Sequence, residues 1–147
     1  MGRMKKMLLI ALLGIVCMEK VAAQTGDTGA NMKAYKIVFQ LTSGDTNVHK
    51  ALVKQIGNAL TAAPNSTIEV VCHSNGIPFL LTAQTRQLAM IKELKAKGVV
   101  FAACENTLRE RKIDKSEVVG EAIFVPSGVI EVVDKEMLGW AYLKAGF

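Results

Sequence analysis

The 147-residue sequence lacks the short motifs that mark most cofactor-binding and hydrolytic folds. Residues 42–45, which follow the first apolar segment, contain neither the repeated glycines nor the lysine with which a nucleotide-binding loop wraps phosphate. The sequence also has no His-Glu-x-x-His helix, no Cys-x-x-Cys pair and no Gly-x-Ser-x-Gly elbow. These absences argue against a Rossmann or P-loop enzyme, a zinc peptidase and a serine hydrolase.

Cysteine is scarce: the whole sequence contains three, Cys17, Cys72 and Cys104. So few cysteines do not make a disulfide-stapled fold, but a single bridge between Cys72 and Cys104 stays open as an alternative. Cys72, His73 and Cys104 also form a weak soft-metal pattern, since three ligands on two segments fall short of a closed site. We therefore predict no metal and no cofactor.

Long hydrophobic runs are missing as well. The apolar run at residues 7–16 holds about ten residues, whereas a membrane-spanning helix needs about 20. Basic residues precede this run and the small residues 21–23 follow it, a pattern that is typical of a secretory signal peptide. We predict a cleaved signal over residues 1–23, a flexible leader over 24–32, and a periplasmic or secreted protein with no membrane contact after cleavage.

The excess of positive charge is concentrated in the same amino-terminal segment. The chain has a formal net charge of +5, and residues 1–23 carry four basic residues against one glutamate, so their removal subtracts three charges and leaves +2. No basic stripe interleaved with aromatic residues remains after that removal. We therefore expect no binding to nucleic acid.

Short apolar segments alternate with amphipathic helical ones in the rest of the chain, 33–147, which has the length of a single domain. Strands are predicted at residues 35–41, 67–72, 99–103, 122–125 and 140–143, and helices at 47–63, 85–97 and 129–139. The almost wholly apolar segment 99–103 is typical of a strand that is covered on both faces. This order predicts an α/β fold, a three-layer α/β/α sandwich with a mainly parallel five-stranded sheet.

The loops after parallel strands meet at one edge of such a sheet, and Cys104 lies in one of them. It follows strand 99–103 where a charged, helix-forming segment begins, near unpaired backbone N–H groups and the positive end of the helix dipole. This setting favours a reactive thiolate that is open to solvent at the rim of the sheet. The alternative is a small apolar residue that fills the end of the strand, and the position alone leaves both interpretations open.

Five stretches resemble the DsrE/DsrF-like family, including its YchN-like members. They are the first strand with its polar turn, residues 68–76, residues 98–108, residues 126–128 before the last helix, and residues 139–143. The resemblance spans residues 33–147 and places Cys104 at the cysteine position of the family. It implies the same fold, a trimeric or hexameric homo-oligomer, and a cysteine that carries sulfur as a persulfide and passes it to a partner protein.

We therefore predict a sulfur-carrier or thiol-redox protein, a possible sulfurtransferase, with Cys104 as the reacting residue. Residues predicted to form its pocket or support the thiol are Cys72, His73, Ser74, Asn75, Gly76, Asn106, Thr107 and Arg109. Two features oppose this interpretation, because an exported chain would not meet cytoplasmic relay partners and the carboxylate of Glu105 disfavours a neighbouring thiolate. The alternative function is a non-enzymatic oligomeric protein that binds a small ligand or a partner and whose cysteines are structural.

Overall fold

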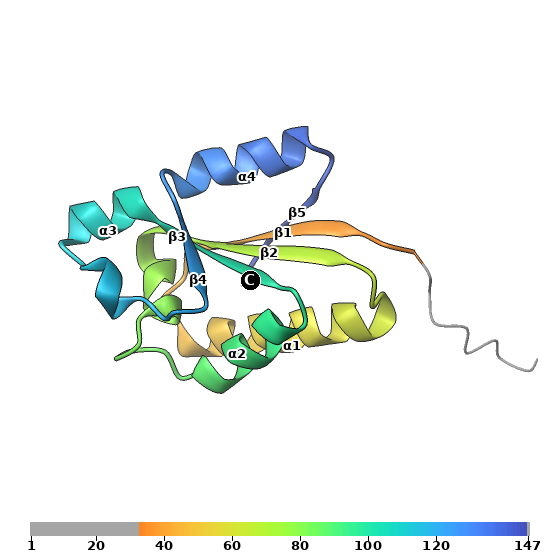
Figure 1. Cartoon of the computed structure of the whole chain (residues 1–147), viewed down its shortest axis with the longest axis horizontal. Helices are drawn as coiled ribbons and strands as arrows, with labels where there is room; N and C mark the ends of the chain where they lie inside the picture. Colours follow the sequence, from red (N-terminus) through yellow and green to blue (C-terminus); the bar gives the residue numbers. More distant parts are fainter. Residues whose placement is uncertain (1–32, 147) are drawn as a thin grey trace, which may run out of the picture.

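The computed structural model describes residues 33–146, so the predicted signal peptide and leader lie outside the described residues. Its core is a five-stranded sheet in the order β4-β3-β2-β1-β5, with every neighbouring pair of strands parallel (Figure 1). The strands are β1 (Lys36–Leu41), β2 (Thr67–Cys72), β3 (Val100–Cys104), β4 (Ala122–Val125) and β5 (Ala141–Lys144). The α-helices are α1 (Thr46–Ala62), α2 (Leu88–Ala96), α3 (Glu105–Arg111) and α4 (Gly128–Met137).

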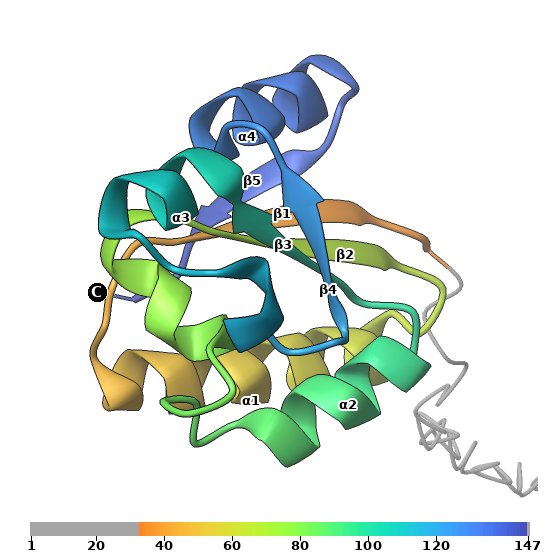
Figure 2. The same ribbon diagram turned by 60° about the vertical axis from the view of Figure 1, so that its left-hand side comes forward.

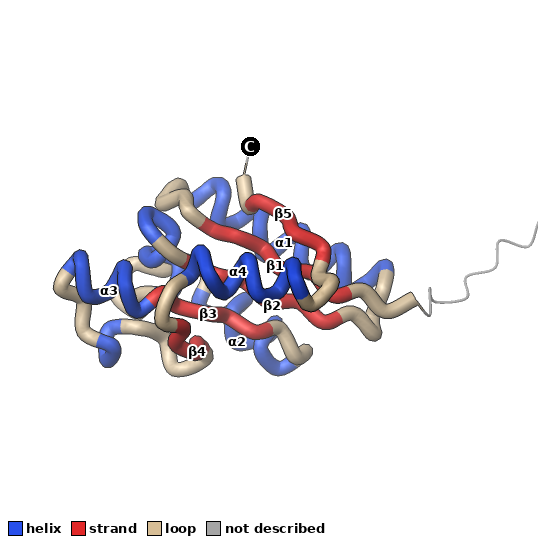
Figure 3. The backbone as a smooth tube through the Cα atoms, turned by 90° about the horizontal axis from the view of Figure 1, so that it is seen from above, coloured by secondary structure: helices blue, strands red, loops and turns tan. Residues whose placement is uncertain are grey.

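Helices cover both faces of the sheet, so the predicted three-layer sandwich is confirmed. Helices α1 and α2 lie on one face and α4 lies on the other (Figure 2). Seen from above, α4 runs across β1, β2 and β3 (Figure 3). The strands are parallel because each returns through a helix or a long connection to the same end of the sheet.

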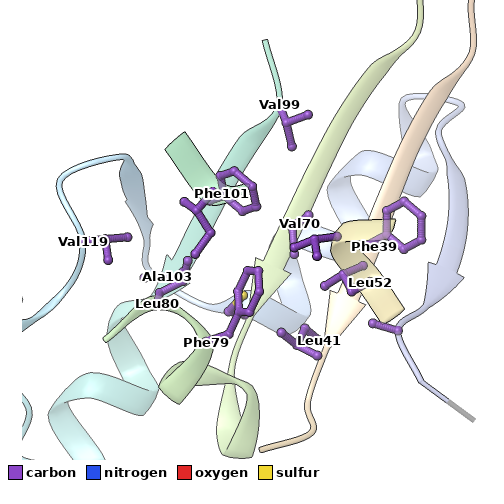
Figure 4. Packing of buried hydrophobic residues seen from close by; sticks show 14 of the residues in the cluster. Phe39, Leu41, Leu52, Val70, Phe79, Leu80, Val99, Phe101, Ala103 and Val119 are labelled. Atoms are coloured by element: carbon purple, nitrogen blue, oxygen red, sulfur yellow. The ribbon is translucent and has the colours of Figure 1, made fainter. Parts of the chain in front are cut away.

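The larger apolar core lies between the sheet and the α1/α2 layer. Phe39, Val70 and Phe101 project from three neighbouring strands into this layer, where Leu52 of α1 lies beside Phe39 and Val70 (Figure 4). The smaller core under α4 contains Val38, Val71 and Ala102, which are neighbours of those residues on the same three strands, together with Val125 of β4 and Val132 of α4. Successive residues of a strand point to opposite faces of the sheet, so the two clusters show which strand residues face the α1/α2 layer and which face the α4 layer.

Local sequence signals explain where several elements begin and end. The Asp45 carboxylate caps α1 by accepting a hydrogen bond from the Asn47 backbone N–H at 2.8 Å. Gly98 follows α2 with a φ of +90°, a left-handed conformation that glycine adopts without a steric penalty. The sequence prediction of strands β2 and β4 has the observed bounds.

The structure differs from the prediction in the connections. Residues predicted as a tight loop and an apolar patch form one 3₁₀ helix, η1 (Ser74–Leu80), and a second short one, η2 (Lys115–Glu117), precedes β4. Helix α2 begins three residues later than predicted, at Leu88, because residues 81–87 form a bridge and turns instead. Cys104 is itself the last residue of β3, and the polar segment after it forms α3. Among residues 33–146, no helix has the length and apolar character needed to cross a bilayer.

Candidate functional site: a cysteine held by hydrogen-bond donors

Cys104 lies at the carboxyl edge of the sheet, as the last residue of β3 and the residue immediately before α3. Its side chain faces the α4 layer, because Ala102, two residues earlier, belongs to the apolar cluster under α4. The Cys104 side chain is 4% exposed, so the expectation of a thiol open to solvent is wrong. The reason is that the first residue of α4 packs directly against the sulfur.

Hydrogen-bond donors lie close to the sulfur. The backbone N–H of Gly128 donates to Cys104 Sγ at 3.2 Å, and Gly128 begins α4. Burial raises the pKa of the Cys104 thiol, but the Thr107 hydroxyl and the nearby N–H groups of Gly128 and Thr107 outweigh this effect. The pKa therefore falls below its ordinary value of 9.0, because these donors stabilise the thiolate.

The Thr107 side chain is oriented by a neighbouring backbone group. The N–H of Ser74 donates to Thr107 Oγ1 at 3.1 Å and occupies one acceptor position of that oxygen. The hydroxyl hydrogen of Thr107 is then available for the sulfur of Cys104. Since Thr107 is buried, water does not compete strongly for this hydrogen.

His73 follows β2 and lies beside the same turn of α4. A Cβ atom built on Gly128 would come within 3.0 Å of His73 Cβ, so glycine lets α4 approach this residue. The two ring nitrogens of His73 lie 2.8 Å from Gln40 Nε2 and 3.0 Å from Ser74 Oγ. Burial lowers the pKa of His73 below its ordinary value of 6.5, so the imidazole is neutral at neutral pH.

Cys72 lies apart from this site. It is fully buried in the core under α1 and α2, so it points to the opposite face of the sheet from Cys104. Burial alone raises the pKa of the Cys72 thiol far above its ordinary value. Both cysteines are free in the structure, and their opposite orientations explain why no bridge joins them.

The same orientations separate the three candidate metal ligands, because Cys72 cannot share an ion with Cys104 across the sheet. In the part of the chain that the structure describes, no group of three His, Cys, Asp or Glu side chains is placed to hold a metal ion.

The remaining predicted residues lie around the edge of the site rather than against the sulfur. Asn75 is exposed and accepts a hydrogen bond from Arg111 at 2.6 Å. Gly76 serves packing, because a Cβ atom there would lie 2.0 Å from the backbone oxygen of Leu41. Arg109 donates to the side chain of Asn106 at the surface, so its charge is directed away from the buried sulfur.

The carboxylate that we expected to disfavour the thiolate has a partner of its own. Glu105 forms a salt bridge with Lys115 at the surface. Two hollows in the molecular surface lie at a different place, between α1 and β1, and one of them extends to β5. Their volumes are about 230 and 370 Å³, and Ile37 and Ala59 line both of them.

Sequence reasoning missed three residues of the site. Gly128 was placed in a turn before the last helix, but nothing in the sequence shows that its N–H reaches Cys104, which lies 24 residues earlier. Gln40 and Tyr142 were assigned to strands, and their side chains are joined by a 2.6 Å hydrogen bond near His73. The one signal available was the presence of polar Gln40 in an otherwise apolar strand end.

The protein is thus a small, single-sheet parallel α/β sandwich, and its candidate site is a cysteine that accepts hydrogen bonds at the carboxyl edge of the sheet. The sequence model of the DsrE/DsrF-like family matches residues 35–144. The chain therefore belongs to the DsrE/DsrF-like family. Among solved structures it is similar to a protein of unknown function, MTH1491, from Methanobacterium thermoautotrophicum. The two are 31% identical, the match covers 75% of this chain and 98% of the other, and the TM-score is 0.72. No curated protein matches the sequence.

Proposed function

We propose that this protein is a sulfur carrier that holds sulfur as a persulfide on Cys104 and passes it to a partner protein. The observation that carries the proposal is the set of donors around Cys104 Sγ, which stabilise a thiolate in a nearly buried position. A carrier cysteine needs this property, because the thiolate is the nucleophilic form of cysteine. The same donors would stabilise the negative charge of a bound persulfide.

The transfer step requires no external oxidant. The Cys104 thiolate attacks the outer sulfur of a donor persulfide, R–S–S–H, and a new S–S bond forms at Sγ. The S–S bond of the donor breaks, its electron pair leaves with the donor as the thiolate R–S⁻, and the proton stays on the transferred sulfur. In the second step an acceptor thiolate attacks that outer sulfur, and Cys104 leaves as a thiolate.

This mechanism requires a sulfur donor to reach the sulfur of Cys104. Because the Cys104 side chain is 4% exposed, the contact between Gly128 and Cys104 has to open for a donor to reach the sulfur. Small reagents should therefore react faster with Cys104 than bulky reagents of equal intrinsic reactivity. Such gating would protect a bound persulfide from water and from unrelated thiols.

The experiment offers glutathione persulfide to the reduced full-length protein and measures the intact mass after the reagent is removed. All variants carry Cys17→Ala, so that Cys72 and Cys104 are the thiols compared. We expect an adduct of one sulfur atom in this background and in Cys72→Ala, and none in Cys104→Ser. An adduct that persists in Cys104→Ser, or no adduct in the background protein, would overturn the proposal.

A second candidate function is a non-enzymatic oligomeric protein that binds a small ligand or a partner. The near-complete burial of Cys104 and the apolar hollows beside β1 favour it. It predicts that Cys104 reacts with neither persulfides nor small alkylating reagents in the folded protein. The same mass measurements therefore distinguish the two functions.

We also propose that the chain assembles as a homo-oligomer, a trimer or a hexamer, through α4. Val132 of this helix faces the sheet, while Val129, Ile130 and Val133 are exposed and Met137 is 81% exposed, so α4 also carries an outward apolar patch among its charged residues. Grouped exposed apolar side chains are typical of an interaction surface. Sedimentation analysis should show an assembly that Val133→Lys dissociates and that Lys54→Glu, on exposed α1 surface, leaves intact.

Export to the periplasm or the medium is the last part of the proposal. It rests on the signal-like pattern of residues 1–23. When the protein is produced in a bacterial host, it should be found outside the cytoplasmic fraction. Its amino-terminal sequence should start at residue 24. An intact amino terminus in the cytoplasmic fraction would contradict export.

A further inference from the structure

A chain of hydrogen bonds crosses the sheet toward Cys104. It starts at Tyr142 on β5, continues through Gln40 on β1 and His73 after β2, and reaches Ser74. These strands lie side by side in the sheet (Figure 2). Ser74 in turn contacts Thr107, whose hydroxyl bonds the sulfur.

The orientation of the Gln40 amide gives the direction of the first links. The Tyr142 hydroxyl donates to Gln40 Oε1 at 2.6 Å, which turns the amide nitrogen of Gln40 toward His73. An amide nitrogen is a donor only, so His73 Nε2 has to accept and carries no hydrogen. The neutral imidazole then holds its proton on Nδ1, and this N–H donates to Ser74 Oγ at 3.0 Å.

Ser74 connects the imidazole to the thiol-bearing half of the site. Its φ is +51°, a left-handed conformation that is unfavourable for a residue other than glycine. In this conformation its hydroxyl meets His73 while its backbone N–H donates to Thr107 Oγ1 at 3.1 Å. The bond from His73 therefore helps to hold Ser74, and through it Thr107, in the orientation that serves Cys104.

We infer that Gln40 and Tyr142 are positioning residues, which hold His73 as its neutral Nδ1–H tautomer. In this tautomer, each donor of the hydrogen-bond series from Tyr142 to Thr107 points toward the sulfur of Cys104. The inference rests on the proposed use of the Cys104 thiolate and deepens it. The thiolate is then stabilised by oriented dipoles and not by an imidazolium. The ionisable groups in and beside the chain are Cys104, His73, Tyr142 and Glu105, and the carboxylate of Glu105 is paired with Lys115.

Heteronuclear NMR of the imidazole nitrogens tests the tautomer directly. In the wild-type protein the His73 signals should show a protonated Nδ1 and an unprotonated Nε2 at neutral pH. Tyr142→Phe removes the hydroxyl at a partly exposed position and should leave a mixture of tautomers. Tyr35→Phe, which is also exposed but lies on the α1 side of the sheet, is the control and should leave the signals unchanged.

Gln40→Glu inverts the polarity of one link. A carboxylate accepts from Nε2–H, so His73 should take up a second proton at neutral pH and become an imidazolium. The midpoint of the pH profile for alkylation of Cys104 should then fall, whereas Tyr142→Phe should slow alkylation below the midpoint by about threefold. Gln40→Glu keeps the size of the Gln40 side chain, so the test changes the polarity of this link and not its packing.

Two results would overturn the inference. One is a wild-type His73 that carries its proton on Nε2. The other is a Gln40→Glu protein in which the His73 signals and the Cys104 profile both stay as in the wild type. Neither measurement uses a sulfur donor. The positioning role of Gln40 and Tyr142 can therefore be tested even if Cys104 does not accept sulfur from a persulfide.

Discussion

Thr107→Val is the substitution that most directly tests how the thiolate is stabilised. Valine has nearly the shape of threonine but removes the hydroxyl that donates to Cys104 Sγ. A hydrogen bond to a charged group contributes about 1.5 kcal/mol at the lower end of the measured range. That energy corresponds to about a tenfold change in the acid dissociation constant, so the pKa of Cys104 should rise.

The rate of alkylation changes by less than the thiolate population does. A less acidic thiol is a better nucleophile, with a Brønsted coefficient of about 0.4–0.5, which offsets part of the loss. Below both midpoints the variant should therefore react about fourfold more slowly, and on the high-pH plateau it should react about threefold faster. Two profiles that cross in this way are the signature of a shifted pKa and not of altered access.

The assay follows the reaction of iodoacetamide with Cys104 as a function of pH, in the Cys17→Ala background. Thr107→Ser keeps the hydroxyl and should restore the wild-type midpoint. Thermal unfolding serves as a check, since Thr107→Val leaves the Ser74 N–H without its acceptor and should cost about 1–3 kcal/mol. A midpoint that is unchanged or lower in the folded variant would refute the role given to Thr107.

Four further predictions concern α1, α4 and the core. Gly128→Ala should destabilise the fold by about 1–3 kcal/mol and slow alkylation, because its Cβ would lie 3.0 Å from the neighbouring histidine. In thermal unfolding Gly57→Ala should instead stabilise by about 0.5–1 kcal/mol, since its Cβ meets nothing within 4 Å. Lys135→Met should cost about 2–3 kcal/mol, because it strands the buried Glu69 carboxylate now 2.6 Å from Lys135. Burial already raises the pKa of Glu69, so the folded variant binds more protons than the unfolded chain, and the loss should shrink as pH falls toward 4.5. The double substitution Glu69→Leu with Lys135→Met should recover this stability in urea unfolding, and a double variant no better than the single would contradict the reasoning. Cys72 should resist alkylation in the native protein and react after denaturation, as mass mapping can show.

The sequence predicted the layers of the fold because they depend on local patterns. The apolar strand 99–103 indicated burial on both faces, and β3 lies in the interior of the sheet between β2 and β4. Prediction was weaker in the connection after β2, where Pro78 and its apolar neighbours form a 3₁₀ helix that packs into the core. Such a segment has no periodic pattern of its own, so tertiary packing decides its conformation.

The sequence by itself determined the order of the strands and helices, the parallel sheet, the family and the identity of the cysteine at the edge of the sheet. Only the tertiary structure decided that Cys104 and Cys72 face opposite layers, because one residue of register reverses the direction of a strand side chain. It also decided which donors reach the sulfur and which groups lie against the two ring nitrogens of His73. Those bonds join groups that are far apart in the chain, such as Gln40 and Tyr142 at a separation of 102 residues, and no local pattern encodes them.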